Sequence, residues 1–94
     1  MVKGKTTSGI KFQIDERIKD DARLLYLLTL LQKGDTSLAE KGQLVFDLLG
    51  MVFGNDGIMP FMDEVAKKNK GICSTEAMMR ELNEIFDAIN AKNL

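Results

Sequence analysis

Residues 71–92 read GICSTEAMMRELNEIFDAINAK, and this stretch decides the fold more than any other part of the chain. Its apolar side chains recur at spacings of four, three and four, which is the pattern of one face of an α-helix. They are Met78, Leu82, Ile85 and Ile89, and Met79 and Phe86 widen the same face. Ser74 or Thr75 is expected to cap the helix by accepting a backbone hydrogen bond. The sequence therefore predicts an amphipathic helix whose apolar face must be covered, either by the rest of the chain or by a partner.

The N-terminal part of the chain predicts one short strand. Residues 10–14, IKFQI, alternate apolar and polar side chains, as half-buried strands do. Residues 1–9 lack such alternation, and we expect a flexible arm there. A lone strand leaves backbone groups unpaired, so it requires a partner: residues 51–53 or 71–73 of the same chain, or the same strand in a second copy. We predict a homo-oligomer that associates through the apolar side chains of this strand, Ile10, Phe12 and Ile14.

Two more helices are predicted after the strand. The first begins at Asp20 or Asp21, and the leucines of residues 24–31 give it an apolar surface wider than a single seam. The second begins with SLAE at residues 37–40. This is a capping box, in which the serine and glutamate side chains satisfy each other's free backbone donors.

A fourth helix completes the predicted fold. Gly50 or Gly54 ends the preceding helix, and Pro60 falls in the first turn of the next, where its missing N–H is tolerated. The predicted fold class is therefore mainly α (α+β), with one short N-terminal strand followed by about four helices. We expect a single small helical domain over residues 10–94, preceded by the arm of residues 1–9.

Composition and charge argue against a domain built to bind phosphates. The 94 residues include 13 basic and 14 acidic side chains, which leaves a net charge of −1 rather than a strong positive charge. The basic cluster of the chain is Lys67, Lys68 and Lys70. It stands where a helix should end, so we interpret it as a solvated last turn favoured by the helix dipole, with a nucleic-acid contact as the alternative.

The sequence carries no pattern typical of catalysis or of metal binding. It has no histidine, so the single cysteine, Cys73, lacks the commonest base that could form a thiolate. Paired carboxylates occur at residues 20–21 and 63–64, but neighbours on a helix point about 100° apart and do not converge. Residues 54–57, GNDG, lack the alternating carboxylates and the final glutamate of a calcium loop. We predict a protein that is not an enzyme and has no cofactor or metal site.

Cysteine usage and hydropathy predict a location inside the cell. One cysteine cannot form a disulfide within the chain, so an oxidising compartment is not implied. No apolar run follows the first five residues, as it would in a signal peptide, and the apolar-rich stretch of residues 24–31 is too short to span a bilayer. We expect a soluble cytoplasmic protein with no membrane partner.

The middle of the chain contains a candidate binding surface for an apolar partner. Residues 51–62, MVFGNDGIMPFM, combine three methionines and two phenylalanines. Methionine is flexible and polarisable, so it suits surfaces that adapt to varied apolar partners; the alternative is that it fills gaps in a small core. The candidate partner-binding residues, including two from the C-terminal helix, are Met51, Phe53, Met59, Phe61, Met62, Met79 and Phe86.

Three stretches of the chain carry a resemblance to a known family. They are TTSGIKFQID at residues 6–15, DDARLLYLL at residues 20–28 and TEAMMRELNEIFDA at residues 75–88. In this order they resemble the small tail assembly chaperones of long-tailed phages and prophages of Gram-positive bacteria. The likeness fades between residues 50 and 70, where the GNDG segment and the MPFM stretch are not features of that family.

The resemblance implies a protein-binding role in virion assembly rather than catalysis. Such chaperones are thought to coat the tape measure protein and keep it soluble in the host cytoplasm until the tail tube polymerises around it. The resemblance implies the tape measure protein and other tail proteins as partners, many copies of the chaperone, and its absence from the mature virion. Two alternatives remain: a small regulatory protein of a mobile element that binds nucleic acid through the lysines of residues 67–70, and a helical adaptor that binds a host factor.

Overall fold

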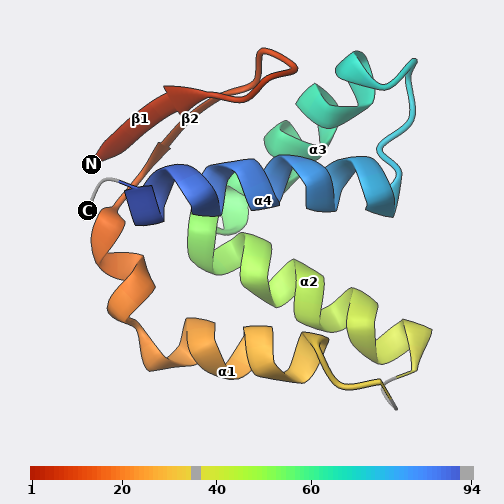
Figure 1. Ribbon diagram of the computed structural model, residues 1–94. Coiled ribbons are helices and arrows are strands. Elements are labelled where there is room, and N and C mark those ends of the chain that lie inside the picture. The colour runs from red at the N-terminus through yellow and green to blue at the C-terminus, as the bar shows by residue number, and fades with distance from the viewer. Residues whose placement is uncertain (35–36, 92–94) are drawn as a thin grey trace. The chain divides into compact units, whose positions relative to one another are not determined.

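The computed structural model describes residues 1–34 and 37–91 of the chain. Their elements are strands β1 (Val2–Lys5) and β2 (Lys11–Ile14), and helices α1 (Ala22–Leu31), α2 (Leu38–Phe53), α3 (Ile58–Lys68) and α4 (Thr75–Ala91) (Figure 1). Two short 3-10 helices, η1 (Glu16–Asp20) and η2 (Asn55–Gly57), precede α1 and α3. The predicted class, mainly α (α+β) with about four helices, is confirmed in the described part of the chain; where one short N-terminal strand was predicted, the structure has two, paired in a small sheet. Residues 35–36 and 92–94, which the predicted domain included, lie outside the described residues.

Contacts divide the chain into two compact units, which are described separately. The hairpin unit consists of residues 1–16 and 59–94, and so holds β1, β2, α4 and nearly all of α3. The helix pair consists of residues 17–58 and holds α1, α2 and η2. The expectation of a single domain over residues 10–94 stays a prediction.

The hairpin contains a second strand that the sequence analysis placed in a flexible arm. β1 pairs antiparallel with β2 in a register that sets Val2 opposite Ile14 and Lys5 opposite Lys11. The expectation of an arm without regular structure is therefore wrong for β1. Val2 is the one apolar residue of β1, and it is buried, so the sequence of β1 does not alternate apolar and polar side chains. Pairing with β2, rather than local sequence preference, makes this segment a strand.

A glycine in β1 makes room for an aromatic ring of β2. Gly4 stands opposite Phe12 in the register. A Cβ atom at Gly4 would lie 2.7 Å from Cζ of Phe12, which is closer than carbon atoms can approach without displacement. The ring of Phe12 therefore covers the glycine, and any larger residue at this position would require the ring to shift.

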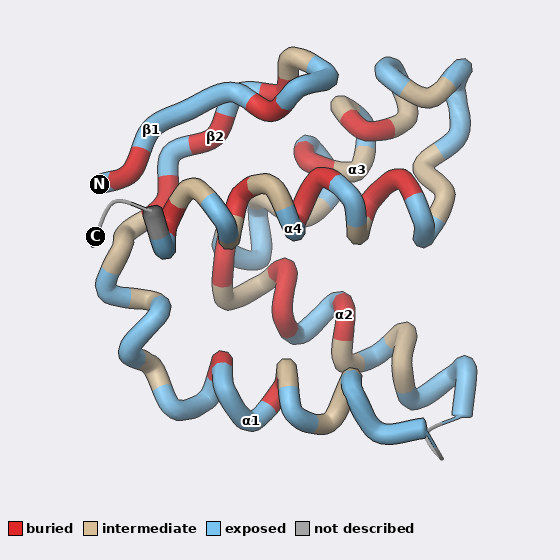
Figure 2. Tube along the Cα trace, viewed as in Figure 1, coloured by how far each residue is buried: buried red, intermediate tan, exposed pale blue. Residues whose placement is uncertain are grey.

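The buried side chains of the hairpin unit follow the patterns expected from the sequence. β2 buries its apolar side chains and exposes Lys11 and Gln13, as the alternation of residues 10–14 predicted. The predicted apolar stripe of α4 is buried (Figure 2). α4 also contacts β1. The buried apolar residues of this unit are Val2, Ile10, Phe12, Ile14, Phe61, Val65, Ala77, Met78, Leu82, Ile85 and Ile89.

Caps resolve the alternatives that the sequence left open at the helix ends. Asp21 is the N-cap of α1 and accepts a hydrogen bond from the backbone N–H of Arg23 at 2.9 Å. Ser37 caps α2 and Ser74 caps the first turn of α4, each through its hydroxyl oxygen. Gly54 ends α2 with a φ of 78°, a conformation that glycine adopts at little cost.

The helix pair is built from two helices that pack against each other. α1 and α2 are in contact. α1 contributes only two buried side chains, Leu24 and Leu27, whereas α2 contributes Val45, Leu48, Leu49 and Val52. α1 thus buries much less of its leucine-rich surface than its composition suggests.

Candidate functional site: a buried carboxylate and apolar surfaces

A buried carboxylate of α4 holds the loop that joins β1 and β2. Glu81 is 3% exposed, and both of its oxygens accept hydrogen bonds from hydroxyl groups of the loop. The Thr6 hydroxyl donates to Oε1 at 2.6 Å and the Ser8 hydroxyl donates to Oε2 at 3.1 Å. Thr6 Oγ1 also accepts a hydrogen bond from the backbone N–H of Ile10 at 3.1 Å. The carboxylate therefore has partners for its charge, as a buried carboxylate requires.

A second carboxylate holds the next residue of the same loop. The backbone N–H and the hydroxyl of Thr7 donate to Oε1 of Glu84 at 2.8 and 2.7 Å. These bonds, the hydroxyl bond first, lower the pKa of Glu84 below its ordinary value. Glu81 and Glu84 are three residues apart and so lie on one side of α4. Together they fix the loop to the helix, and we name this arrangement the carboxylate tie.

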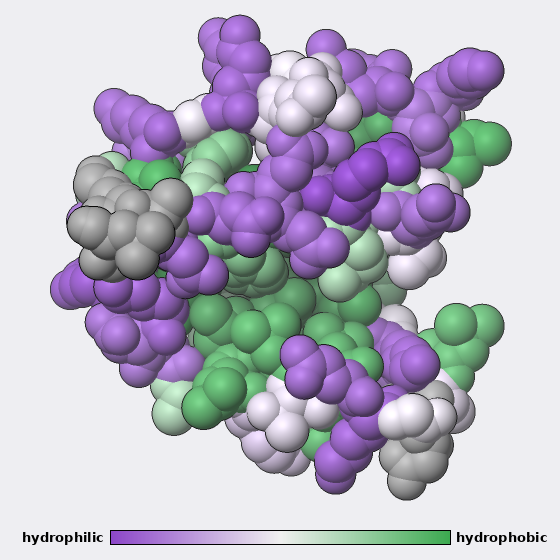
Figure 3. Space-filling view, in the orientation of Figure 1, coloured by the Kyte–Doolittle hydropathy of each residue, from purple (hydrophilic) through white to green (hydrophobic). Residues whose placement is uncertain are grey.

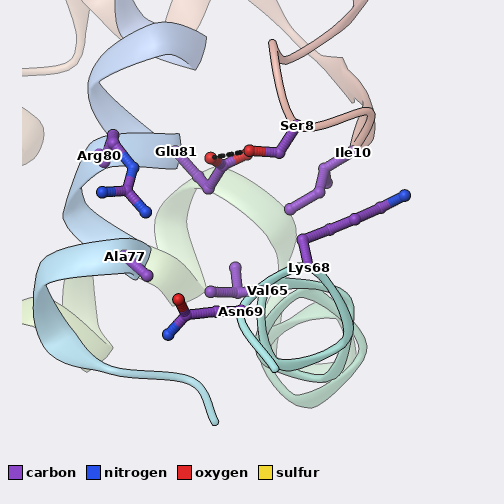
Figure 4. Close-up of a pocket in the computed structure, with 8 residues that line it drawn as sticks. All are labelled: Ser8, Ile10, Val65, Lys68, Asn69, Ala77, Arg80 and Glu81. Carbon is purple, nitrogen blue, oxygen red and sulfur yellow. Dashed lines mark hydrogen bonds between the residues drawn. The ribbon is translucent and has the colours of Figure 1, made fainter. Parts of the chain in front are cut away.

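The hairpin unit contains a small pocket beside the carboxylate tie. The volume of the pocket is about 10 Å³, which is room for a single water molecule. In Figure 4 the Lys68 ammonium points away from Glu81, and the Ser8 hydroxyl faces the carboxylate. The pocket is far smaller than the sites that hold organic substrates. Its lining residues are Ser8, Ile10, Val65, Lys68, Asn69, Ala77, Arg80 and Glu81.

The single cysteine lacks the surroundings of a reactive thiol. Cys73 is half-buried in the segment between α3 and α4. Burial, and then the negative charge of Asp63, raise the pKa of its thiol. The thiol is therefore protonated at neutral pH, whereas the nucleophilic form is the thiolate.

The predicted partner-binding residues fall in both compact units. Met51 and Phe53 belong to α2 of the helix pair, and the other five belong to α3 and α4 of the hairpin unit. Met59 is 61% exposed, so solvent reaches most of its side chain. Phe61 is only 6% exposed and contributes to the core of its unit rather than to a surface. The half-buried members of the set are Met51, Phe53, Met62, Met79 and Phe86.

The predicted self-association residues are buried in the hairpin unit. Ile10, Phe12 and Ile14 all belong to its core. β2 pairs with β1, which supplies within the chain the partner that a lone strand requires. Lys3, Lys5 and Lys11 are exposed on the two strands, and charged side chains at sheet edges oppose pairing between molecules. The main reason for predicting association through this strand is thereby removed.

The lysine cluster occupies the position that the sequence analysis gave it. Lys67 and Lys68 lie in the last turn of α3, where positive charge complements the helix dipole. Lys67 Nζ is 3.4 Å from Oε1 of Glu64. All three lysines, including Lys70, are exposed.

The carboxylate tie was not predicted from the sequence, although α4 carried a signal of it. Glu81 stands three residues after Met78 and four before Ile85, so its spacing places a charge on the buried side of the helix. A buried charge implies nearby donors. Those donors, Thr6 and Ser8, stand in a stretch that was expected to form a flexible arm.

Comparisons with known proteins find no family model, no curated protein and no solved structure that matches this chain. In the described ranges, no single helix has both the length and the apolar character needed to cross a membrane; α2 and the segment Asn55–Lys68 meet the criterion only jointly, across a sharp bend. A search of the same ranges finds no group of three or more acidic, cysteine or histidine side chains that could hold a metal ion.

Proposed function

We propose that this protein is a tail assembly chaperone that binds the tape measure protein and keeps it soluble during virion assembly. The observation that carries the proposal is the partial exposure of methionine and phenylalanine side chains in the hairpin unit, with Met59 at 61%. The resemblance of residues 6–15, 20–28 and 75–88 to such chaperones supports the same conclusion.

The positions of these side chains suit a helical, apolar partner. Met59 and Met62 are three residues apart on α3, and Met79 and Phe86 are seven apart on α4, so each pair lies along one side of its helix. Methionine adapts its shape to different apolar neighbours. A tape measure protein is expected to be long and helical with exposed apolar stripes, which a small chaperone covers by laying its own apolar side chains against them.

The proposal is tested by co-expression of this chain with a large tape measure protein from a long-tailed phage or prophage of Gram-positive bacteria. We expect the tape measure protein to become soluble and to co-purify with many copies of this chain. Met59→Asp should abolish co-purification, because it places a charge in the apolar contact without disturbing the core. Ile72→Asp is the matched control, since Ile72 is 66% exposed in the same unit but lies outside α3 and α4. A tape measure protein that is indifferent to the wild-type chain would overturn the proposal.

A nucleic-acid-binding function is the second candidate. The observation that favours it is that six lysines of the hairpin unit are exposed: Lys3, Lys5, Lys11, Lys67, Lys68 and Lys70. The net charge of −1 opposes it. Contacts to phosphates would make binding to DNA weaken steeply as salt concentration rises, so titration of duplex DNA at two salt concentrations distinguishes the two functions.

A further inference from the structure

The β1–β2 hairpin has one buried face and one exposed face. The inner face holds Phe12 and Ile14, which are buried, and α4 contacts β1. Because side chains alternate between the two faces of a strand, the residues in between point outward. We name the outward set the outer face of the hairpin; its residues are Lys3, Lys5, Lys11 and Gln13, and all four are exposed. In Figure 3 hydrophilic side chains gather over β1 and β2 on the side away from α4.

The charge of the outer face is positive throughout. Residues 1–14 contain three lysines and no acidic residue. Lys68 of α3 adds a fourth ammonium group at the loop end of the hairpin, since a Cβ atom placed at Gly9 would lie 3.4 Å from its Nζ atom. Among the residues that the structure describes, none forms an ion pair or a hydrogen bond with the ammonium groups of these four lysines.

The acidic residues that contact the hairpin or follow it lie off the outer face. Glu81 and Glu84 reach the loop from α4, and both accept hydrogen bonds from loop hydroxyls. Asp15 and Glu16 follow β2 at the end opposite the loop, where Glu16 forms an ion pair with the N-terminal ammonium at 2.8 Å. The positive charge of the outer face is therefore not compensated by carboxylates of the same unit.

The pairing of two lysines across the hairpin points to an anionic partner. Lys5 stands directly opposite Lys11 in the register. Like charges at directly opposite positions of a strand pair repel each other and destabilise the sheet, whereas an acidic side chain at either position would stabilise it. A partner with negative charge would remove this repulsion.

The shape and composition of the outer face select among anionic partners. The major groove of B-form DNA is about 12 Å wide and admits a two-stranded β-ribbon, and there lysine binds guanine edges and glutamine binds adenine edges. The corresponding groove of double-stranded RNA is too narrow for side chains to read. The four residues of the outer face include no aromatic side chain on which single strands could stack and no apolar side chain that could enter a membrane.

We propose that the hairpin binds duplex DNA by placing its outer face in the major groove, with Lys68 on a phosphate at the edge of the groove. The lysines and Gln13 of the outer face then face the bases and the flanking phosphates. The proposal rests on the nucleic-acid-binding candidate, to which it adds the binding element and the groove, and it is independent of the chaperone function.

Fluorescence anisotropy of labelled duplex DNA, titrated with the full chain at about 50 and about 200 mM salt, tests the contact. A variant with both Lys5→Gln and Lys11→Gln should raise the dissociation constant about tenfold or more at the lower salt concentration. It should also reduce the slope of log affinity against log salt concentration by about two. Its melting temperature should not fall, because the like charges no longer face each other. The matched control is Lys19→Gln with Lys33→Gln, which removes the same charge from exposed positions of the helix pair and should leave the slope unchanged.

Dimethyl sulfate footprinting identifies the groove. The reagent methylates guanine N7, which lies in the major groove, and adenine N3, which lies in the minor groove. The wild type should protect guanine N7 and leave adenine N3 reactive. Protection of adenine N3, or full binding by the variant of Lys5 and Lys11, would overturn the hairpin contact but not the nucleic-acid-binding candidate. Tighter binding to single-stranded DNA or to phosphatidylserine vesicles would overturn duplex DNA as the partner, and a wild type that fails to bind duplex DNA at low salt would overturn both.

Discussion

α4 and α1 are both rich in apolar residues, yet the chain uses them differently. α4 confines its apolar side chains to one side and buries most of them, together with a glutamate that accepts hydrogen bonds from two hydroxyl groups. α1 is apolar nearly all round, yet only two of its side chains are buried, and it exposes Leu25 and Tyr26. The comparison shows that the asymmetry of a helix, rather than its hydrophobic content, indicates how much of it a chain covers by itself.

Truncation of a leucine in each helix should give the largest contrast. Leu82 on α4 is fully buried, so Leu82→Ala should lower the free energy of unfolding by about 2–5 kcal/mol through lost burial and a residual cavity. Leu25→Ala on α1 should change it by about 0.5 kcal/mol or less. Urea denaturation of dilute, monomeric samples measures both. Equal losses of unfolding free energy would show that the Leu25 side chain is packed within the chain rather than exposed.

Removal of the buried carboxylate of Glu81 should give the next largest loss of stability. Glu81→Ala leaves the hydroxyls of Thr6 and Ser8 without their acceptor, which should lower the free energy of unfolding by about 1–3 kcal/mol. Asn83→Ala, at an exposed position on the same helix, is the control and should have an effect of about 0.5 kcal/mol or less. Amide hydrogen exchange should also accelerate in β1 in the Glu81 variant only. Unchanged protection there would mean that the hairpin holds its place without the carboxylate tie.

Glycine-to-alanine substitutions should change stability in opposite directions in the two units. Gly4→Ala pushes a Cβ into the ring of Phe12 and should destabilise the hairpin unit by about 1–3 kcal/mol. Gly42 lies inside α2, and no neighbouring atom lies within 4 Å of the position that a Cβ would take there, so Gly42→Ala should stabilise the helix pair by up to about 1 kcal/mol. Thermal unfolding measures both changes. Rescue of Gly4→Ala by Phe12→Leu would assign the loss to the ring, and a neutral Gly4→Ala would refute the close contact.

The elements that sequence analysis predicted are those whose signal is local. The apolar stripe of α4, the cap at Ser37, the cap at Ser74 or Thr75 and the alternation over β2 each depend on residues a few positions apart. Spacing rules and capping chemistry operate at that range, so they sufficed for the four helices and for one strand.

The features that sequence analysis missed depend on distant residues. β1 contains one buried apolar side chain and becomes a strand only by pairing with β2. Thr6 and Glu81 are 75 positions apart, so no local pattern links them. The exposure of Leu25 could not be predicted either, because a leucine-rich helix reads as a core element whether or not the chain has enough surface to cover both of its sides.

The smallest expected effect concerns pH. The pKa of Glu84 in the folded chain is lower than its ordinary value of 4.5, because Thr7 donates hydrogen bonds to the charged form. The folded state is therefore stabilised above that value, and this stabilisation is lost as pH falls through the lowered folded pKa. Glu84→Gln should flatten the dependence of unfolding free energy on pH below neutrality while leaving the fold intact. In the helix pair, hydrogen bonds from Arg23 lower the pKa of Asp21 to about 2. Asp21 therefore also stabilises the folded state above its ordinary pKa and loses that effect as pH falls, so Asp21→Asn is the matched comparison. If Glu84→Gln leaves the slope between pH 5 and pH 3, about the range in which a carboxylate titrates, identical to that of the wild type, the bonds from Thr7 do not hold the loop in solution.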